Sequence, residues 1–304
     1  MTFSGLFVPL ITPFTADGDV ALRALESLAH ELLDAGATGL VALGTTGEPS
    51  ALTPAERAAV LAVVERVSRT RRTPWIAGVH DGIVPASADA AMHAVPAFVR
   101  PGEEGVIAHF AALAAASPVP VVVYHVPYRT AQPLSAGALL RLASLPNVIA
   151  MKYAPGTLDA TAMAFMAAAA DVPGFSILVG DDVLAGPLLA LGAPGAVMAA
   201  GHIATADYAA LIAAWQSGDL PGGRALSHRL APRSAALFAA PNPTVIKGVL
   251  HAEGRIPSAA VRVPLTPAAP EQVAQARGLL TLVSPERAAQ GLSTPVTPEQ
   301  VAHV

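Results

Sequence analysis

The sequence predicts an α/β protein, a (β/α)8 TIM barrel with extra C-terminal helices. Short β-branched runs alternate with longer Ala- and Leu-rich stretches of helical period, which is the pattern of parallel strands joined by helical crossovers. Eight such units fit into roughly 200 residues, which favours a closed barrel. A doubly wound parallel sheet shows the same alternation and is the alternative. Hydrophobic residues make up 53% of the 304-residue chain, enough for a large core.

The predicted strands are short apolar runs. They are Leu6–Ile11, Thr38–Leu43, Pro74–Val79, Ala88–Val95, Pro120–Tyr124, Val148–Lys152, Ser176–Gly180 and Gly195–Ala199. Helical patterns lie between most of them, for example Val20–Ala35, Thr53–Arg69, Glu104–Ala116 and Ser135–Ser144. The second of these helices opens with Thr53-Pro-Ala-Glu56, which has the form of a capping box.

The connection between the third and fourth strands is too short for a helix. It is the eight-residue segment His80-Asp-Gly-Ile-Val-Pro-Ala-Ser87, whereas a crossover between parallel strands normally needs a dozen residues or more. Eight extended residues span roughly 26–29 Å, enough to return along one strand but not to include a helix. We therefore predict a barrel that has seven crossover helices and lacks the third.

The chain divides into two parts in this interpretation. Residues 1–204 form the barrel, and residues 205–304 form a C-terminal helical extension that packs on it. The last predicted helix is Ala268–Val283. The segment 284–304 is rich in Pro, Ser and Gln, and we expect a loosely held tail there.

Composition excludes several classes of function. A net charge of −4 and the absence of Lys/Arg clusters beside aromatic residues argue against nucleic-acid binding. The chain has no cysteine, so it has no disulfide framework, thiolate nucleophile or Cys-ligated zinc. The apolar N-terminus lacks a basic leader and is interrupted by Pro9 and Pro13, and other apolar stretches are broken before they reach membrane-spanning length. We expect a cytoplasmic protein without a membrane partner.

Lys152 is the strongest candidate for chemistry. The chain contains two lysines against 16 arginines, which suggests that Arg replaces Lys wherever only positive charge is needed. Lys152 closes the apolar run Val148-Ile-Ala-Met, which is predicted as a buried strand. A buried ammonium can lose its proton and become a nucleophilic amine, whereas a guanidinium stays charged. The position therefore favours a Schiff-base lysine.

Two further features fall where strands of the predicted barrel end. Gly44-Thr-Thr-Gly-Glu48 follows the second strand, and its glycines allow a tight turn whose backbone N–H groups can hold a carboxylate or phosphate. Tyr124-His-Val-Pro-Tyr-Arg129 follows the fifth strand and supplies a phenol, an imidazole and a guanidinium. Active sites of such barrels lie at this end, so these residues and Lys152 are expected to converge.

Each feature has an ordinary interpretation when taken alone. A Gly-Thr-Thr-Gly segment is more often simply a turn, Tyr124 a core aromatic, Arg129 a surface charge and Lys152 a solvated lysine. Their joint placement at three strand ends is what favours a site. For Lys247, in the predicted late helix after Pro241-Asn-Pro243, a structural or surface role is favoured.

With these motifs the chain resembles the pyruvate-dependent Schiff-base lyases, the family that includes dihydrodipicolinate synthase and N-acetylneuraminate lyase. The resemblance covers nearly the whole chain and is closest to the synthase-like members. It rests on Val8-Pro-Leu-Ile-Thr-Pro13, Gly44-Thr-Thr-Gly-Glu48, Tyr124-x-Val-Pro-x-Arg129-Thr, Lys152, Gly180-Asp-Asp182, Gly192-x-x-Gly195, Pro241-Asn-Pro243 and Arg262-Val-Pro-Leu-Thr-Pro267. It implies a barrel with additional C-terminal helices and a homo-oligomer, a dimer or tetramer.

The resemblance also implies a reaction in which no metal or organic cofactor is required. Lys152 forms an imine with pyruvate, the iminium withdraws electrons, and the resulting enamine adds to an aldehyde or releases one. Tyr124 carries protons, and Thr45 belongs to the same relay. Arg129 orients the carboxylate of the aldehyde partner. The implied site is catalytic Lys152, Tyr124 and Thr45, with Thr46, Gly47, Glu48 and Arg129 binding substrate.

The chain departs from the family pattern at two places near the site. Phe98 stands where the family has a tyrosine that reaches across the dimer to complete the proton relay, and Phe98 has no hydroxyl. His125 stands where an asparagine is common, which suggests a different aldehyde partner. The predicted loss of the third crossover helix also removes a segment that helps to form the dimer interface.

Other functions on the same barrel stay open at this point. One is another 2-oxo-acid aldolase or dehydratase of the family, and another is a non-catalytic member that only binds pyruvate. A metal-dependent aldolase or hydrolase is suggested by His80, Asp81, His93 and His125 near strand ends, although these residues lack a ligand-type spacing.

Overall fold

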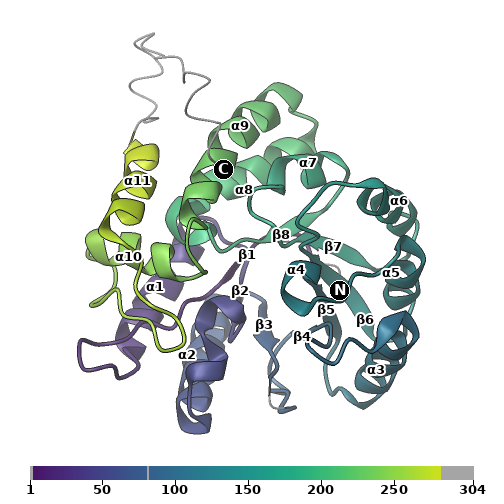
Figure 1. The fold of residues 1–304 in the computed structure, drawn as a ribbon, viewed down its shortest axis with the longest axis horizontal. Helices are drawn as coiled ribbons and strands as arrows, with labels where there is room; N and C mark the ends of the chain where they lie inside the picture. The colour runs from purple at the N-terminus through teal and green to yellow at the C-terminus, as the bar shows by residue number, and fades with distance from the viewer. Residues whose placement is uncertain (1–2, 81, 282–304) are drawn as a thin grey trace.

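Eight parallel strands close into a barrel in the computed structural model, which describes residues 3–80 and 82–281 (Figure 1). Each strand pairs with its neighbour in the chain, and β1 pairs with β8 to close the ring. This closure confirms the (β/α)8 barrel and rules out the doubly wound sheet, which has two open edges.

All eight predicted strands are present, mostly shortened by one or two residues at their ends. They are β1 Gly5–Pro9, β2 Gly39–Ala42, β3 Trp75–Gly78, β4 Ala90–Ala94, β5 Val121–His125, β6 Val148–Tyr153, β7 Ser176–Val179 and β8 Gly195–Val197. Alternate residues point to opposite faces. In β5, Val122 and Tyr124 therefore face the barrel interior, whereas Val121 and Val123 face the helices.

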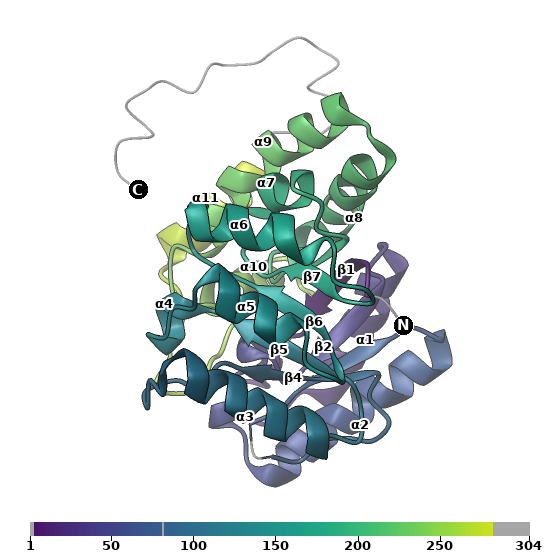
Figure 2. The ribbon, with the colours of Figure 1, turned by 90° about the vertical axis from the view of Figure 1, so that its right-hand side faces the viewer.

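Seven helices connect consecutive strands or follow the last strand, and they surround the barrel (Figure 2). They are α1 Leu22–Asp34, α2 Pro54–Arg71, α3 Gly102–Ala116, α5 Ala136–Ala143, α6 Ala160–Ala169, α7 Ala185–Ala190 and α8 Gly201–Ser217. Helix α2 begins with the predicted capping box, because Thr53 and Glu56 each accept a hydrogen bond from the other's backbone N–H. One-turn elements, η1 Thr45–Gly47, η2 Pro49–Ala51 and α4 Pro127–Thr130, lie at the ends of β2 and β5.

Among the described residues between β3 and β4, none is helical, which confirms the missing crossover. The segment is fixed at its far end, where Asp89 accepts a hydrogen bond from the Trp75 backbone N–H at 2.9 Å. The Trp75 indole N–H donates to the Ser87 carbonyl oxygen at 3.1 Å. Next to this segment, a cavity of about 550 Å³ lies between the ends of β3 and β4 and helix α3.

The C-terminal helices are α9 Leu220–Leu237, α10 Thr244–Ala252 and α11 Pro270–Thr281. Helix α10 contacts α8 and α11, and α11 contacts α9, so these helices form one layer beside the barrel (Figure 1). The proposed division at residue 204 falls inside α8, where Ala204 has non-helical φ/ψ values; the division stays a prediction. Val283 of the predicted last helix and the segment 284–304 lie outside the described residues. No helix within residues 3–80 and 82–281 has the length and apolar character needed to cross a membrane.

Candidate active site

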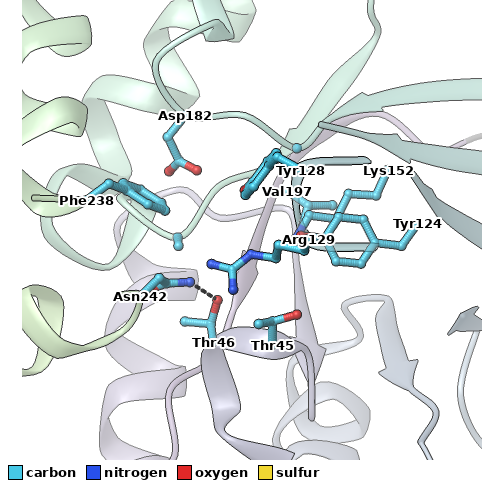
Figure 3. Close-up of a pocket in the computed structure, with 12 residues that line it drawn as sticks. Thr45, Thr46, Tyr124, Tyr128, Arg129, Lys152, Asp182, Val197, Phe238 and Asn242 are labelled. Atoms are coloured by element: carbon cyan, nitrogen blue, oxygen red, sulfur yellow. Dashed lines mark hydrogen bonds between the residues drawn. The ribbon is translucent and has the colours of Figure 1, made fainter. Parts of the chain in front are cut away.

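A small cavity opens at the C-terminal ends of the strands and collects five of the seven site residues expected from the sequence (Figure 3). Its volume is about 20 Å³, and a single water needs about 10–15 Å³. Side chains at its mouth must therefore move to admit a substrate. The lining consists of Thr45, Thr46, Tyr124, Tyr128, Arg129, Lys152, Gly180, Asp182, Val197, Ala199, Phe238 and Asn242.

Lys152 enters the cavity from β6 and is buried, with 6% of its surface exposed. In the sheet it lies between Tyr124 of β5 and Leu178 of β7. Burial lowers the pKa of Lys152 to about 8, against the opposing effect of the Asp182 carboxylate. Gly180 makes room for its stem, because a Cβ atom there would lie 2.7 Å from the Lys152 Cγ. Lys152 is therefore closer to its neutral, nucleophilic form than a solvated lysine.

Tyr124 stands beside Lys152 on the inner face of β5. The Lys152 Nζ atom lies 4.3 Å from the centroid of the Tyr124 ring. Burial raises the pKa of Tyr124 to about 12, while a hydrogen bond with the Thr45 side chain opposes this shift. The phenol therefore keeps its proton at neutral pH and can exchange it with a group bound at Lys152.

The loop after β2 supplies Thr45 and Thr46 to the cavity from the 3-10 helix η1. The buried Thr46 hydroxyl accepts a hydrogen bond from the Asn242 amide at 2.9 Å (Figure 3). The Gly47 carbonyl oxygen accepts one from the Thr12 hydroxyl at 2.7 Å. In its hydrogen bond with Asn242 the Thr46 hydroxyl is the acceptor. The proton of this hydroxyl can therefore be donated to another group, including one bound in the cavity.

Gly47 and Glu48 were expected to bind substrate, but neither residue lines the cavity. The Glu48 side chain is buried on the other side of the loop, where it forms an ion pair with Lys247. Its second carboxylate oxygen accepts a hydrogen bond from the backbone N–H of Arg262 at 2.8 Å. The geometry thus separates this loop into a half that faces the cavity and a half that faces the C-terminal helices.

Arg129 and Tyr128 form the outer side of the cavity from the short helix α4. In Figure 3 the Arg129 guanidinium points toward Thr46 and Asn242, away from Lys152. Its central carbon lies 5.6 Å from the centroid of the Tyr128 ring, and Tyr128 is 62% exposed. Because Tyr128 is largely exposed, this pair can move without breaking many buried contacts.

Asp182 lines the cavity as well, although the motif Gly180-Asp-Asp182 by itself predicted no role for this side chain. The Asp182 carboxylate points into the cavity (Figure 3). It accepts a hydrogen bond from the Ala200 backbone N–H at 2.7 Å. Burial raises the pKa of Asp182 to about 7, against the effects of that hydrogen bond and of Lys152. Its position just after β7 was the available signal, because residues at the carboxyl ends of barrel strands face the site.

Phe238 and Asn242 also reach the cavity, from the segment between α9 and α10. Phe98 does not line it; the side chain is 97% exposed on the loop after β4. His125 does not line it either, because it faces outward and stacks on Tyr153 with ring centroids 5.8 Å apart. The placement of His125 gives no support to a role in choosing the aldehyde.

The histidines that suggested a metal site do not lie close together in the structure. His80 and His93 line the separate cavity of about 550 Å³ beside α3, whereas His125 stacks on Tyr153 of β6. The His80 Nε2 atom is 2.9 Å from the Leu43 carbonyl oxygen. Within the part of the chain that the structure describes, no three His, Asp or Glu side chains are grouped as a metal ion would need. Asp81 lies outside that part.

Comparison with known proteins shows relatives along nearly the whole chain. A curated 4-hydroxy-tetrahydrodipicolinate synthase from Moorella thermoacetica is 36% identical over 283 residues, which cover 90% of this chain and 95% of that protein. The chloride-inhibited dihydrodipicolinate synthase from Acinetobacter baumannii, solved in complex with pyruvate, has a TM-score of 0.84 and 32% identity. The match covers 92% of this chain and 98% of that one.

A monomeric dihydrodipicolinate synthase variant is similar as well, with a TM-score of 0.84 and 26% identity over 91% of this chain and 96% of that one. The pattern that describes the dihydrodipicolinate synthetase family matches residues 2–282. Sequence, fold and the lysine at the end of β6 agree with one another. The chain belongs to the dihydrodipicolinate synthetase family, as a pyruvate-dependent Schiff-base lyase of the dihydrodipicolinate synthase-like type.

Proposed function

We propose that Lys152 forms an imine with pyruvate and that the resulting enamine is joined to an aldehyde. One observation carries this proposal: a buried lysine, flanked by the phenol of Tyr124, faces a small cavity at the carboxyl ends of the barrel strands. The pyruvate complex of the Acinetobacter baumannii relative supports the choice of oxo acid.

The reaction begins at the Lys152 amine. With a pKa of about 8, about a tenth of the amine is neutral at pH 7, compared with less than a thousandth for a solvated lysine. The amine attacks the ketone carbon of pyruvate, and the carbinolamine loses water to give the iminium. The phenolate that Tyr124 becomes on donating a proton takes one from the methyl group, which gives the enamine, and the enamine carbon attacks the aldehyde carbon. Water then hydrolyses the product imine and frees the Lys152 amine.

Tyr124 moves protons during these steps. Its phenol donates to the carbinolamine hydroxyl as that group leaves as water, and it later donates to the oxygen of the attacked aldehyde. A phenol with a pKa raised to about 12 must be re-protonated after each donation. The hydroxyl of Thr45, which is hydrogen-bonded to it, is the neighbouring group through which a proton can return.

The two carboxylates of the substrates would be held by different side chains of the cavity. The hydroxyls and backbone N–H groups of Thr45 and Thr46 hold the pyruvate carboxylate near Lys152. The guanidinium of Arg129 holds a carboxylate on the aldehyde by a bidentate pair. Among aldehydes, we therefore propose one that carries a carboxylate, with aspartate semialdehyde first, in line with the names of the relatives. Neither substrate calls for a metal or an organic cofactor.

Borohydride reduction in the presence of pyruvate tests the imine directly. We expect a pyruvate-sized mass increase located on Lys152 by peptide mapping, because reduction converts the imine into a stable amine. Folded protein that gains no such mass would refute the proposed function. A screen of carboxylated and uncarboxylated aldehydes with the same protein then tests the role given to Arg129.

We also propose that the protein is a cytoplasmic homo-oligomer, a dimer or tetramer. Phe98 and Val99 support this proposal, because both are largely exposed on one loop, and adjacent exposed apolar side chains favour a contact surface. Since one solved relative is a monomeric variant, light scattering of purified protein is the measurement that decides. A mass equal to one chain would contradict the oligomer.

A further inference from the structure

The second lysine of the chain is more deeply buried than the first. Lys247 lies on α10 with 0% of its surface exposed, and its Nζ atom donates hydrogen bonds to the Glu48 carboxylate and to the Ala260 carbonyl oxygen. The same atom lies 4.0 Å from the centroid of the Phe14 ring. These three contacts are all with parts of the folded chain.

Glu48 is connected to the C-terminal part of the chain through both of its carboxylate oxygens. One oxygen accepts from Lys247, and the other accepts from the backbone N–H of Arg262 at 2.8 Å. Arg262 is itself fixed, because its guanidinium pairs with Glu56 and donates to the Gly18 and Ala51 carbonyl oxygens. The carboxylate therefore joins the loop after β2 to two segments that are about 200 residues away in sequence.

The backbone of Glu48 has a conformation that glycine would adopt more easily. Its φ and ψ angles are 53° and 41°, in the left-handed region, where a side chain is sterically unfavourable. Glu48 ends the 3-10 helix Thr45–Gly47, whose first two residues line the cavity. The Lys247 and Arg262 contacts hold the Glu48 side chain in place and, through it, this unfavourable turn.

We propose that Glu48 and Lys247 are positioning residues for the pyruvate carboxylate. Without touching substrate, the buried pair fixes the turn so that the Thr45 and Thr46 hydroxyls and N–H groups face the cavity. This inference rests on the proposed function, because it assigns the carboxylate to this loop. It also gives a reason for a lysine at position 247. The compact ammonium contacts Glu48, Ala260 and Phe14 at the same time, and the larger, planar guanidinium of an arginine would not fit the same space.

The competing explanation is that the ion pair only stabilises the fold. The two explanations predict different effects of removing the pair on melting temperature and on pyruvate binding. Loss of a stabilising pair lowers the melting temperature but leaves the affinity of the folded molecules for pyruvate unchanged. Loss of a positioning pair weakens pyruvate binding in molecules that are folded. Small displacements of binding groups cost roughly tenfold to a hundredfold, so the effect is measurable.

The experiment uses Glu48→Gln, Lys247→Met and the double variant Glu48→Gln/Lys247→Met. For each, we would measure kcat, KM for pyruvate, melting temperature, and the pyruvate concentration that gives half-maximal borohydride trapping at Lys152. The double variant leaves no unpaired buried charge, so it keeps the test possible where a single variant does not fold. Asp207→Asn is the matched control, because Asp207 pairs with Arg229 and Arg233 between α8 and α9, away from the cavity.

We expect KM and the half-saturating concentration to rise about tenfold or more in every folded Glu48 and Lys247 variant, with kcat changed less than KM. The double variant should resemble the single ones, because either change releases the turn. Asp207→Asn should lower the melting temperature and leave both pyruvate measures unchanged.

Three outcomes would overturn the inference. One is a folded Glu48→Gln or double variant with unchanged KM and half-saturation, and another is an equal shift in Asp207→Asn. The third is failure of all three Glu48 and Lys247 variants to fold, which would assign the pair to stability alone. Absence of trapping in the unmodified protein would instead refute the proposed function, so the two failures are distinguishable.

Discussion

Lys152 and Tyr124 are direct neighbours in the barrel sheet, paired in register across β6 and β5, with the Lys152 Nζ atom 4.3 Å from the Tyr124 ring centroid. Since the two residues lie on adjacent rigid strands, their separation does not depend on a loop. The proposed nucleophile and its proposed proton donor are therefore pre-organised before a substrate enters. Cavity residues outside the strands, among them Thr45, Arg129 and Asp182, are placed by the connections that follow the strands.

Lys152→Arg should abolish the reaction while the fold is kept. The guanidinium retains the positive charge but cannot become a nucleophilic amine, so turnover with pyruvate should fall by at least about a thousandfold. Borohydride trapping and the circular dichroism spectrum would be measured on the same sample. Lys152→Met, which removes the charge as well, is the companion variant and should be equally inactive. Full activity of the arginine variant would make the assignment of Lys152 wrong.

The pH dependence of kcat/KM should report the amine of Lys152. Its pKa is lowered to about 8, so the rate should rise with pH below about 8, as the ammonium loses its proton, and level off above. The Asp182 carboxylate stabilises that ammonium. Asp182→Asn should therefore lower the pKa of Lys152 further and move the midpoint of the profile to lower pH. A midpoint that stays in place or moves to higher pH would contradict this coupling.

Gly180→Ala should damage catalysis more than stability. A Cβ atom at position 180 would lie 2.7 Å from the Lys152 Cγ and displace the lysine stem, so we expect kcat to fall roughly tenfold to a hundredfold. Gly137→Ala, in α5, is the control, because its Cβ would meet nothing closer than the Ser135 Oγ at 3.9 Å. The control should keep full activity, and kinetics of both variants at saturating pyruvate make the comparison. Equal activity of the two variants would show that catalysis does not require the space that Gly180 leaves for the Lys152 side chain.

Stability should fall as the pH is lowered from about 6.5 to about 4. Burial lowers the pKa of His93, His125 and His202 to about 4, so between these values the unfolded chain binds more protons than the folded one. The stabilisation by the neutral imidazoles is complete above pH 6.5 and is lost toward pH 4, by roughly 1–3 kcal/mol for each histidine. Urea unfolding across this range measures the loss. His125→Phe removes one of the three groups and should make the decline shallower; an unchanged decline would exclude His125 as a contributor.

The sequence by itself determined the strands, the missing crossover and the lysine that we propose as the nucleophile. Apolar runs and helical periods are local properties, so all eight strands could be located to within one or two residues. The absent helix followed from the eight residues available between β3 and β4. Lys152 could be singled out because a lysine at the end of a buried strand is unusual in a chain that otherwise uses arginine.

Only the tertiary structure decided which side chains share the cavity with Lys152. The sequence placed Glu48 with the substrate-binding residues, but the left-handed turn at this residue directs its carboxylate away from the cavity and toward Lys247. Asp182 and Asn242 enter from segments whose approach depends on how β7 and α10 pack. Spacing along the chain cannot reveal these contacts, because they join residues up to about 200 positions apart. Backbone direction and long-range packing, which local sequence patterns do not encode, determined this part of the site.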